Sequence, residues 1–308
     1  MNLNNIIRKI ISLLSFWYIN KKILLSKDLI LRKEIIKKIN NKNINIKLLK
    51  KTHLNFNQKI FLLLKSNKLK SFLRESFIQK MFFLHNRLFI YWELKQLKKD
   101  KKWKFYKTLL AEDHIGDPVR YFLYPQSSGN RINHVFHLKI LSDELNIILK
   151  KDIKKVFEFG SGYGCMARIF SKIRKNINYN CFDTFHVNLL QYYYLKHNYL
   201  DVGFTKNKKI FLTSDLIKKG NFDLFIANWS LSETPIFFRG KFISTILRSK
   251  IILICFQEKF EDIDNLKYFN NLKNKLSNKF NIRIIENKFY KGNIFFKQKH
   301  YFFIGKKL

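Results

Sequence analysis

Three glycines alternate with other residues at positions 160, 162 and 164, between an apolar run and a segment with helical spacing. The run KKVFEF, residues 154–159, is typical of a β-strand, and the residues that follow Cys165 are typical of a helix. Glycines in a strand-to-helix turn let the backbone approach a ligand closely, and the helix N-terminus offers unpaired N–H groups to it. The sequence EFGSGYG therefore predicts a nucleotide-type cofactor site.

The spacing of these glycines narrows the choice of ligand. A dinucleotide fingerprint would have the pattern GxGxxG, and a P-loop would have Lys followed by Ser or Thr after the turn; neither occurs here. Asp183 ends the next apolar run, where a carboxylate can accept hydrogen bonds from both hydroxyls of a ribose. Ser214 and Asp215 end the run after that, where a polar side chain can meet an adenine amino group.

The C-terminal half alternates short β-rich runs with helical ones. Crossover helices fit between the first five runs, which predicts a parallel sheet, whereas the last two runs are close enough to pair as an antiparallel hairpin at one edge. Upstream of them, residues 1–105 are predicted to be a helical region, residues 106–150 a substrate-side loop and linking helix (helix 133–149), and residues 151–308 the cofactor-binding domain. The seven runs are residues 154–159, 178–183, 208–213, 222–228, 250–256, 282–287 and 300–305.

This arrangement resembles the class I S-adenosylmethionine-dependent methyltransferases over residues 151–308. The resemblance implies an α/β, Rossmann-like sheet of seven strands, mostly parallel, with an antiparallel seventh strand, and S-adenosyl-L-methionine as the cofactor. In that family the glycine-rich loop holds the amino-acid part of the cofactor, and the fourth strand ends beside the transferred methyl group. The cofactor-binding residues implied here are Glu158, Gly160, Ser161, Gly162, Gly164, Asp183, Ser214, Asp215, Asn228 and Trp229.

A narrower resemblance covers roughly residues 108–308. The segments EFGSGYG, LLQYYYL, EDHIGDP and NWSLSE (residues 228–233) are similar to those of the sugar O-methyltransferases, bacterial enzymes of surface-glycan synthesis. One departure is Thr184-Phe185, where that group has Leu-Pro after the acid; this affects the turn more than the carboxylate. The resemblance implies O-methylation of a sugar hydroxyl in a glycan or in a nucleotide- or lipid-linked precursor.

Three side chains are candidates for the chemistry of methyl transfer. A sugar hydroxyl is a weak acid, so a positioned base or a divalent metal must help to remove its proton. His114 and Asp117 lie on a polar loop that could fold over the site as a lid, and Glu233 follows the fourth strand. Asp117 before Pro118 is also typical of a turn, and Glu233 of a helix cap. His134 and His137 are expected to be solvated or packed rather than to bind metal.

The charge of the chain leaves other functions open. The sequence has 60 Lys and Arg against 22 Asp and Glu, a net charge of +38, which would suit an RNA methyltransferase. The lysines are scattered rather than gathered in one block. We therefore attribute the positive charge to the general amino-acid composition of the chain and expect no specific nucleic-acid partner. A third alternative is a non-catalytic binding protein that keeps the fold, against which the intact glycine-rich loop argues.

The cellular setting is inferred from the cysteines and from the N-terminal apolar run. Cys165, Cys181 and Cys255 form no CxxC pair and no metal-type spacing, which favours reduced thiols and a cytoplasmic location. Residues 10–19 are too short to span a bilayer and are predicted to form an amphipathic helix. That helix would pack on the body of the protein, or touch an anionic membrane and so place the enzyme at the inner membrane face.

Overall fold

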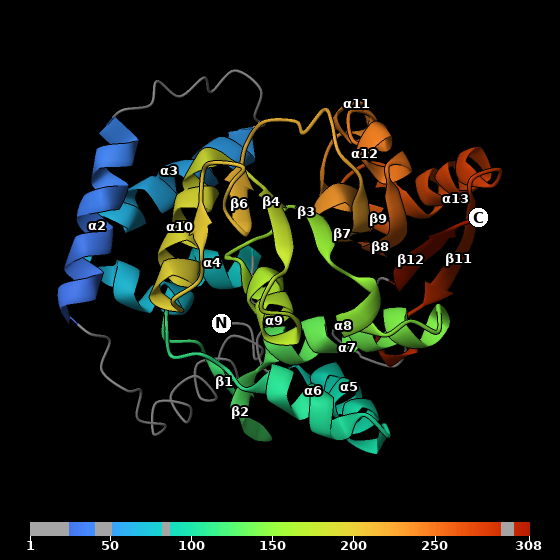
Figure 1. The fold of residues 1–308 in the computed structure, drawn as a ribbon, viewed down its shortest axis with the longest axis horizontal. Coiled ribbons are helices and arrows are strands. Elements are labelled where there is room, and N and C mark those ends of the chain that lie inside the picture. Colours follow the sequence, from blue (N-terminus) through green and yellow to red (C-terminus); the bar gives the residue numbers. More distant parts are fainter. Residues whose placement is uncertain (1–24, 41–50, 82–86, 291–298) are drawn as a thin grey trace.

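An eight-stranded sheet forms the centre of the molecule in a computed structural model that describes residues 25–40, 51–81, 87–290 and 299–308 (Figure 1). The strand order is β11-β12-β8-β7-β3-β4-β6-β5. In this sheet β12 runs opposite to the other seven strands and pairs antiparallel with both β8 and β11. The strands are β3 (Lys155–Phe159), β4 (Asn178–Phe182), β5 (Val202–Gly203), β6 (Ile210–Thr213), β7 (Phe222–Asn228), β8 (Ser249–Gln257), β11 (Phe280–Glu286) and β12 (His300–Lys307).

Each central strand is apolar on both faces, because helices cover the sheet on both sides. In β3, Val156 belongs to the core on one side, and Phe157 and Phe159 to the core on the other. The second core is rich in phenylalanine: the rings of Phe157 and Phe225 stack at 5.6 Å, and Phe242 closes on Phe159 at 4.5 Å. The central strands β7 and β8 are therefore nearly continuous apolar segments, whereas β11 at the edge alternates buried and exposed residues.

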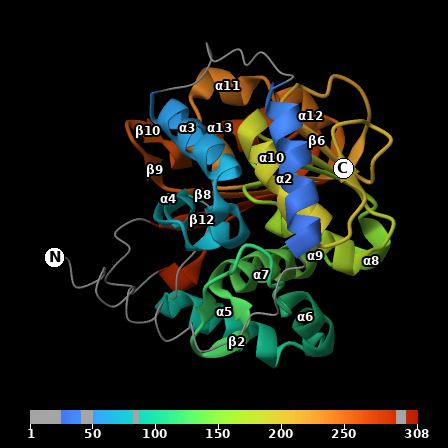
Figure 2. The ribbon, with the colours of Figure 1, turned by 90° about the vertical axis from the view of Figure 1, so that its left-hand side faces the viewer.

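The helices fall into two layers around the sheet (Figures 1 and 2). The first core packs under α2 (Leu25–Asn40), α3 (Lys51–Lys65), α7 (Gly129–Glu144), α9 (Cys165–Ile173) and α10 (Phe185–His197). The second core packs under α11 (Ile236–Gly240), α12 (Ile243–Leu247) and α13 (Asn265–Leu276). The remaining described elements are η2 (Asn67–Arg74), α4 (Ser76–Met81), α5 (Leu88–Lys99), α6 (Trp103–Leu110), β1 (Arg120–Tyr121), β2 (Tyr124–Ser128), α8 (Leu149–Asp152), η3 (Ser230–Glu233), β9 (Lys259–Phe260), β10 (Ile263–Asp264) and η4 (Lys288–Tyr290).

The described helices α2 and α3 both pack on α10, and α2 lies in front of α10 in Figure 2. The hydroxyl of Tyr192 donates to Glu34 at 2.6 Å, and the hydroxyl of Tyr193 donates to Asp28. Tyr193 and Tyr194 are fully buried. The tyrosine run therefore serves helix packing, and the helical N-terminal region shares one apolar core with the cofactor domain.

The predicted fold class is confirmed, with differences in detail. All seven predicted runs are strands of one sheet, and β11 and β12 form the antiparallel pair at its edge. The sheet has one strand more than predicted, the two-residue β5, and the predicted loop contains the β1–β2 hairpin. Helix α7 begins at Gly129 rather than at residue 133, because the Ser128 hydroxyl caps it by accepting from the Arg131 N–H at 3.2 Å. Residues 10–19 lie outside the described residues.

Candidate active site

The glycine-rich turn between β3 and α9 has a conformation that requires glycine. Gly160, Gly162 and Gly164 all have positive φ, at 67°, 54° and 93°. A Cβ atom on Gly160 would lie 2.2 Å from the Cβ of Ser230, which is too close for any side chain. The Gly160 N–H donates to the Phe182 carbonyl at 2.8 Å, so the turn is attached to the end of the neighbouring strand. The predicted loop is thus present with the backbone geometry expected of a ligand-binding turn.

Asp183 lies directly against this turn. Its carboxylate accepts from the Gly162 N–H at 3.2 Å and from the Thr184 N–H at 2.8 Å. Burial raises the pKa of Asp183 to about 7, although the backbone hydrogen bonds from Thr184 and Gly162 act to lower it. The structure therefore brings together two residues that the sequence places 21 positions apart.

Glu158 supports the turn from inside the protein. Its side chain is buried and accepts a hydrogen bond from the Tyr179 hydroxyl at 2.8 Å, and the Ser161 hydroxyl donates to its backbone carbonyl at 3.2 Å. Burial raises the pKa of Glu158 to about 8, so its carboxyl group is mainly neutral at pH 7. The buried Glu158 thus supports the loop from inside, and its predicted contact with the cofactor stays a prediction.

The carboxyl end of β6 carries polar groups at the same edge of the sheet as Asp183. Ser214 is half-buried and Asp215 is exposed. The Asp215 N–H donates to the Thr213 hydroxyl at 3.0 Å, and this hydroxyl in turn donates to the Asp215 carbonyl at 3.2 Å. This small turn fixes the backbone at the strand end and leaves the Asp215 carboxylate in solvent.

At the end of β7 the chain bends sharply at Trp229, which has the left-handed backbone conformation with φ 60°. The Trp229 indole N–H donates to Nδ1 of His300 at 3.0 Å, and Oδ1 of Asn228 lies 3.2 Å from Nδ1 of His137. Burial lowers the pKa of His300 to about 4 and that of His137 to about 3, so both rings are neutral at pH 7. Because Nδ1 of His300 accepts from Trp229, its hydrogen is on Nε2.

Asn228 carries an unused donor at this position. Its amide nitrogen is buried and has no hydrogen-bond partner within the part of the chain that the structure describes. A buried donor without a partner costs about 1–3 kcal/mol. An oxygen of a bound ligand would satisfy this donor.

Glu233, on η3, has the protonation behaviour of a base that works near neutral pH. Burial raises its pKa to about 7, and the Gln257 side-chain N–H donates to it at 3.4 Å. The side-chain oxygen Oε1 of Gln257 accepts from the Ser232 hydroxyl at 2.8 Å, which orients this side-chain amide. A carboxylate held in this way can accept a proton from an acceptor hydroxyl.

His114 and Asp117 are both attached to arginines. Asp117 accepts from Arg74 at 3.0 and 3.3 Å, which ties the loop to η2, and Nδ1 of His114 lies 3.2 Å from a guanidinium nitrogen of Arg120. Both loop residues are therefore held by arginines, and their predicted catalytic roles stay predictions.

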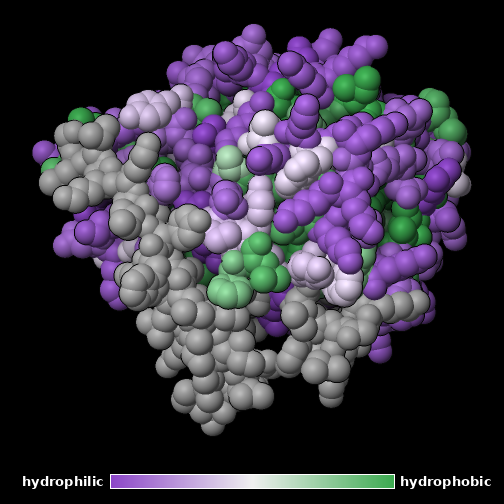
Figure 3. All heavy atoms as spheres, turned by 90° about the horizontal axis from the view of Figure 1, so that it is seen from below, coloured by the Kyte–Doolittle hydropathy of each residue, from purple (hydrophilic) through white to green (hydrophobic). Residues whose placement is uncertain are grey.

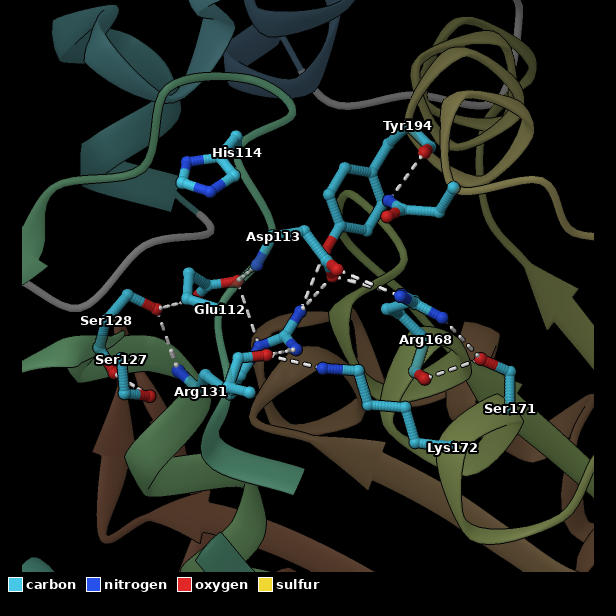
Figure 4. A network of polar contacts seen from close by, with 12 residues as sticks. Glu112, Asp113, His114, Ser127, Ser128, Arg131, Arg168, Ser171, Lys172 and Tyr194 are labelled. Carbon is cyan, nitrogen blue, oxygen red and sulfur yellow. Dashed lines mark hydrogen bonds and ion pairs between the residues drawn. The ribbon is translucent and has the colours of Figure 1, made fainter. Parts of the chain in front are cut away.

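Buried ion pairs hold the loop that carries His114 (Figure 4). Arg131, fully buried on α7, is paired with Glu112 at 2.9 Å and with Asp113 at 2.8 Å. Asp113 also accepts two hydrogen bonds from Arg168 of α9, at 2.9 and 3.0 Å. Burial alone would raise the pKa of Asp113, but the charges of Arg131 and Arg168 hold it well below its usual range. The start of this loop is therefore anchored to α7 and to α9, the helix that follows the glycine-rich turn, and closure of its residues 114–117 over the site stays a prediction.

Sequence reasoning missed the roles of Gln257 and His300 and assigned none to His137 beyond packing. The packing interpretation of His134 and His137 agrees with their burial on α7, where the pKa of His134 also falls to about 3. Gln257 and His300 reach the site from strand ends, and nothing in their local sequence marks them. Over the described ranges there is no group of three His, Cys, Asp or Glu side chains that could hold a metal ion. No helix in those ranges is both long and apolar enough to cross a bilayer.

Comparisons with known proteins find similarity only among solved structures. No protein-family model matches the sequence, and no curated protein matches it significantly. The StiE O-MT structure is 11% identical, with a TM-score of 0.42, and the alignment covers 55% of this chain and 72% of that one. An rRNA methylase from Streptococcus thermophilus is 13% identical, with a TM-score of 0.40, over 58% and 95% of the two chains. The methyltransferase domain of bacterial CtHen1-CN is 12% identical, with a TM-score of 0.41, over 54% and 97%.

Proposed function

We propose that this chain is an S-adenosylmethionine-dependent O-methyltransferase that acts on a sugar hydroxyl of a glycan or an activated sugar precursor. The observation that carries the proposal is the contact between the glycine-rich turn and Asp183, formed by the Gly162 N–H and the Asp183 carboxylate at 3.2 Å. This contact places an acid beside a backbone turn at the ends of two neighbouring parallel strands, where ligands bind in open α/β sheets.

The residues present fit the cofactor. Gly160, Gly162 and Gly164 keep side chains away from the turn, and Asp183 is half-buried with lone pairs to accept ribose hydroxyls. Bound S-adenosyl-L-methionine would supply an electrophilic methyl group on a sulfonium. The protein has to orient the acceptor oxygen toward that group and to take up the proton of the acceptor.

The end of β7 supplies the groups for the acceptor. Glu233 would take the proton of the sugar hydroxyl, since its pKa of about 7 matches this task at neutral pH. The unpartnered amide N–H of Asn228 would donate to an oxygen of the sugar. Both roles need only the chain's own residues, so the proposal does not depend on a divalent metal.

An RNA methyltransferase is the competing function. Base-directed amino methyltransferases carry an Asn/Asp-Pro-Pro-aromatic motif after the fourth strand, and residues 228–233 are NWSLSE instead. The high positive charge is the feature that favours RNA. A methyl-transfer assay of the purified protein against extracted surface polysaccharide and total RNA, side by side, distinguishes them: labelled polysaccharide supports the proposal, and label only in RNA contradicts it.

Cofactor binding can be measured without knowing the acceptor. We expect S-adenosylhomocysteine to bind, and Asp183→Ala to weaken its binding by about 1–3 kcal/mol, the scale of a lost charged hydrogen bond. Because the pKa of free Asp183 is about 7, affinity should rise as the pH is increased from 6 to 8 and the carboxyl group ionises. Titration calorimetry of both proteins checks this. The control is Asp262→Ala, which changes an exposed acid beside the helices of the other layer.

A further inference from the structure

Four large side chains are exposed on one side of the molecule, on α5 and on the β1–β2 hairpin. Tyr91 and Trp92 of α5 are 39% and 45% exposed, and Phe122 and Leu123 at the turn of the hairpin are 59% and 52% exposed. Single exposed apolar residues are common, but a group of them marks a surface that meets something apolar.

The hairpin and α5 form one surface. The Tyr121 hydroxyl, one residue before the exposed turn, donates at 3.5 Å to the carbonyl of Arg87, the residue before α5. Tyr124, just after the turn, has the Lys98 ammonium 5.3 Å from its ring centroid and the ring of Trp103 at 6.3 Å. Phe122 and Leu123 are therefore held between residues that contact the start of α5, its end and the start of α6.

Positive charge is concentrated on the same elements, and the Lys95 ammonium lies 5.1 Å from the ring centroid of Trp92. Helices α5 and α6 and the turn between them carry seven lysines, at positions 95, 98, 99, 101, 102, 104 and 107. The two acids of this stretch are not available to neutralise them at the surface: Glu93 is buried, and Asp100 is bound by Lys139 at 3.1 Å. Figure 3 shows this side of the molecule, on which hydrophilic side chains surround apolar patches.

We propose that the α5–α6–hairpin face docks on an anionic lipid surface. Tyr and Trp favour the interface between lipid and water, where their rings are buried and their polar atoms stay hydrated, and lysines around them attract acidic headgroups. RNA is the less suitable partner for this face. Leu123 cannot stack on a base, and the rings of Tyr91 and Trp92 pack edge to face at 69° rather than as parallel platforms.

The same helix links this face to the candidate active site. On the buried side of α5, Glu93 accepts hydrogen bonds from the Asn133 amide at 2.9 and 3.0 Å. Asn133 lies on α7 four residues before His137, which contacts Asn228. Docking through the exposed side of α5 would therefore place the acceptor end of the site two helices from the headgroup layer, a position suited to an acceptor carried on a lipid.

The test is co-sedimentation of the full chain with vesicles of phosphatidylcholine alone or with one third phosphatidylglycerol. We expect binding only to the anionic vesicles and weaker binding at 0.5 M than at 0.1 M NaCl. The double substitution Trp92→Ala and Phe122→Ser should reduce the affinity at least tenfold. The matched control is the double substitution Ile236→Ala and Phe237→Ser. These exposed apolar residues lie on α11, in the other helix layer, so their replacement should leave the affinity unchanged.

A second pair of variants separates this face from the general charge of the chain. Replacing Lys95, Lys98 and Lys99 by Gln should lower vesicle affinity several-fold more than the same change at Lys267, Lys275 and Lys279, which lie on and just after α13. Equal effects of the two triple variants would overturn the proposal, as would an unchanged affinity of the Trp92 and Phe122 variant. Tighter binding to a single-stranded RNA, lost in that variant, would assign the face to nucleic acid instead. These outcomes do not depend on methyl transfer, so the proposed function stands or fails separately.

Discussion

Glu233 is the side chain on which the proposed proton transfer depends. Replacing it by Gln keeps the shape and the contact with Gln257 but removes the base, so we expect kcat to fall by about 10²–10³-fold, within the usual range for general-base catalysis. In the unsubstituted enzyme kcat should rise with pH through about 7 as Glu233 loses its proton, and this rise should be absent in Glu233→Gln. Measuring kcat from pH 5.5 to 8.5 checks both. Glu144→Gln, which alters an exposed ion pair with Arg283, is the control, and an equal loss of kcat in it would contradict the role of Glu233.

At the residue scale, the site residues that could be predicted are those marked by a local sequence pattern. Gly160, Gly162 and Gly164 are recognisable because positive φ at three alternate positions demands glycine, and Asp183 because a carboxylate ends the next strand. The contacts of Gln257 with Glu233 and of His300 with Trp229 span 24 and 71 residues. Such contacts exist only once the strands are side by side, so no local pattern announces them.

The turn between β3 and α9 is the structural element most sensitive to a single methyl group. Gly160→Ala would force an L-residue into the left-handed backbone conformation and place its Cβ 2.2 Å from that of Ser230. We therefore expect the free energy of unfolding to fall by about 2–4 kcal/mol. Gly240→Ala is the matched control, because a Cβ at that helical glycine has nothing within 4 Å. Chemical denaturation of both variants measures the difference. Adding Ser230→Gly should recover part of the loss, and if it recovers nothing the close approach to Ser230 is not the cause.

At the scale of elements, length and apolar continuity decided what could be predicted. The central runs are buried strands flanked by helices, the run in β11 is partly exposed at the edge, and each run was recognisable from its β-branched and aromatic residues. Strand β5 has two residues, and the β1–β2 hairpin has polar strands with Pro125 in one of them, so neither has a pattern that differs from a loop. The start of α7 was placed too late because Ser128, its cap, is itself the last residue of hairpin strand β2.

At the scale of the whole molecule, some buried carboxyl groups of the folded protein keep a proton at pH 7. Burial raises the pKa of Glu93 and Glu158 to about 8, against an ordinary value of 4.5, so both keep a proton at pH 7 that the unfolded chain releases. Buried histidines have the opposite shift: the pKa of His134 and His137 falls to about 3, so their contribution to stability is complete above about pH 6.5 and is lost below it.

These shifts fix the sign of the pH dependence between pH 6.5 and 8. A carboxyl group with a raised pKa contributes stability at low pH that is lost as the pH rises toward the folded-state pKa, and each such group contributes a slope of up to about 1.4 kcal/mol per pH unit. The histidines are neutral in the folded state, and in the unfolded chain they lose their remaining protons between pH 6.5 and about 7.5, which offsets only part of this change. We therefore expect the free energy of unfolding to fall by a few kcal/mol from pH 6.5 to 8, as measured by denaturant titration at constant ionic strength.

The double variant Glu93→Gln and Glu158→Gln isolates the two deepest carboxyl groups. Glutamine can still accept hydrogen bonds from Asn133 and from Tyr179 but has no proton to lose, so the slope should become clearly shallower, mostly through greater relative stability at pH 8. The control is Asp201→Asn, an exposed acid paired with Lys208, which should leave the slope unchanged. If the slope stayed as steep in the double variant, Glu93 and Glu158 would both be ionised in the folded protein. The carboxyl group of Glu158 beneath the glycine-rich turn would then be charged rather than neutral.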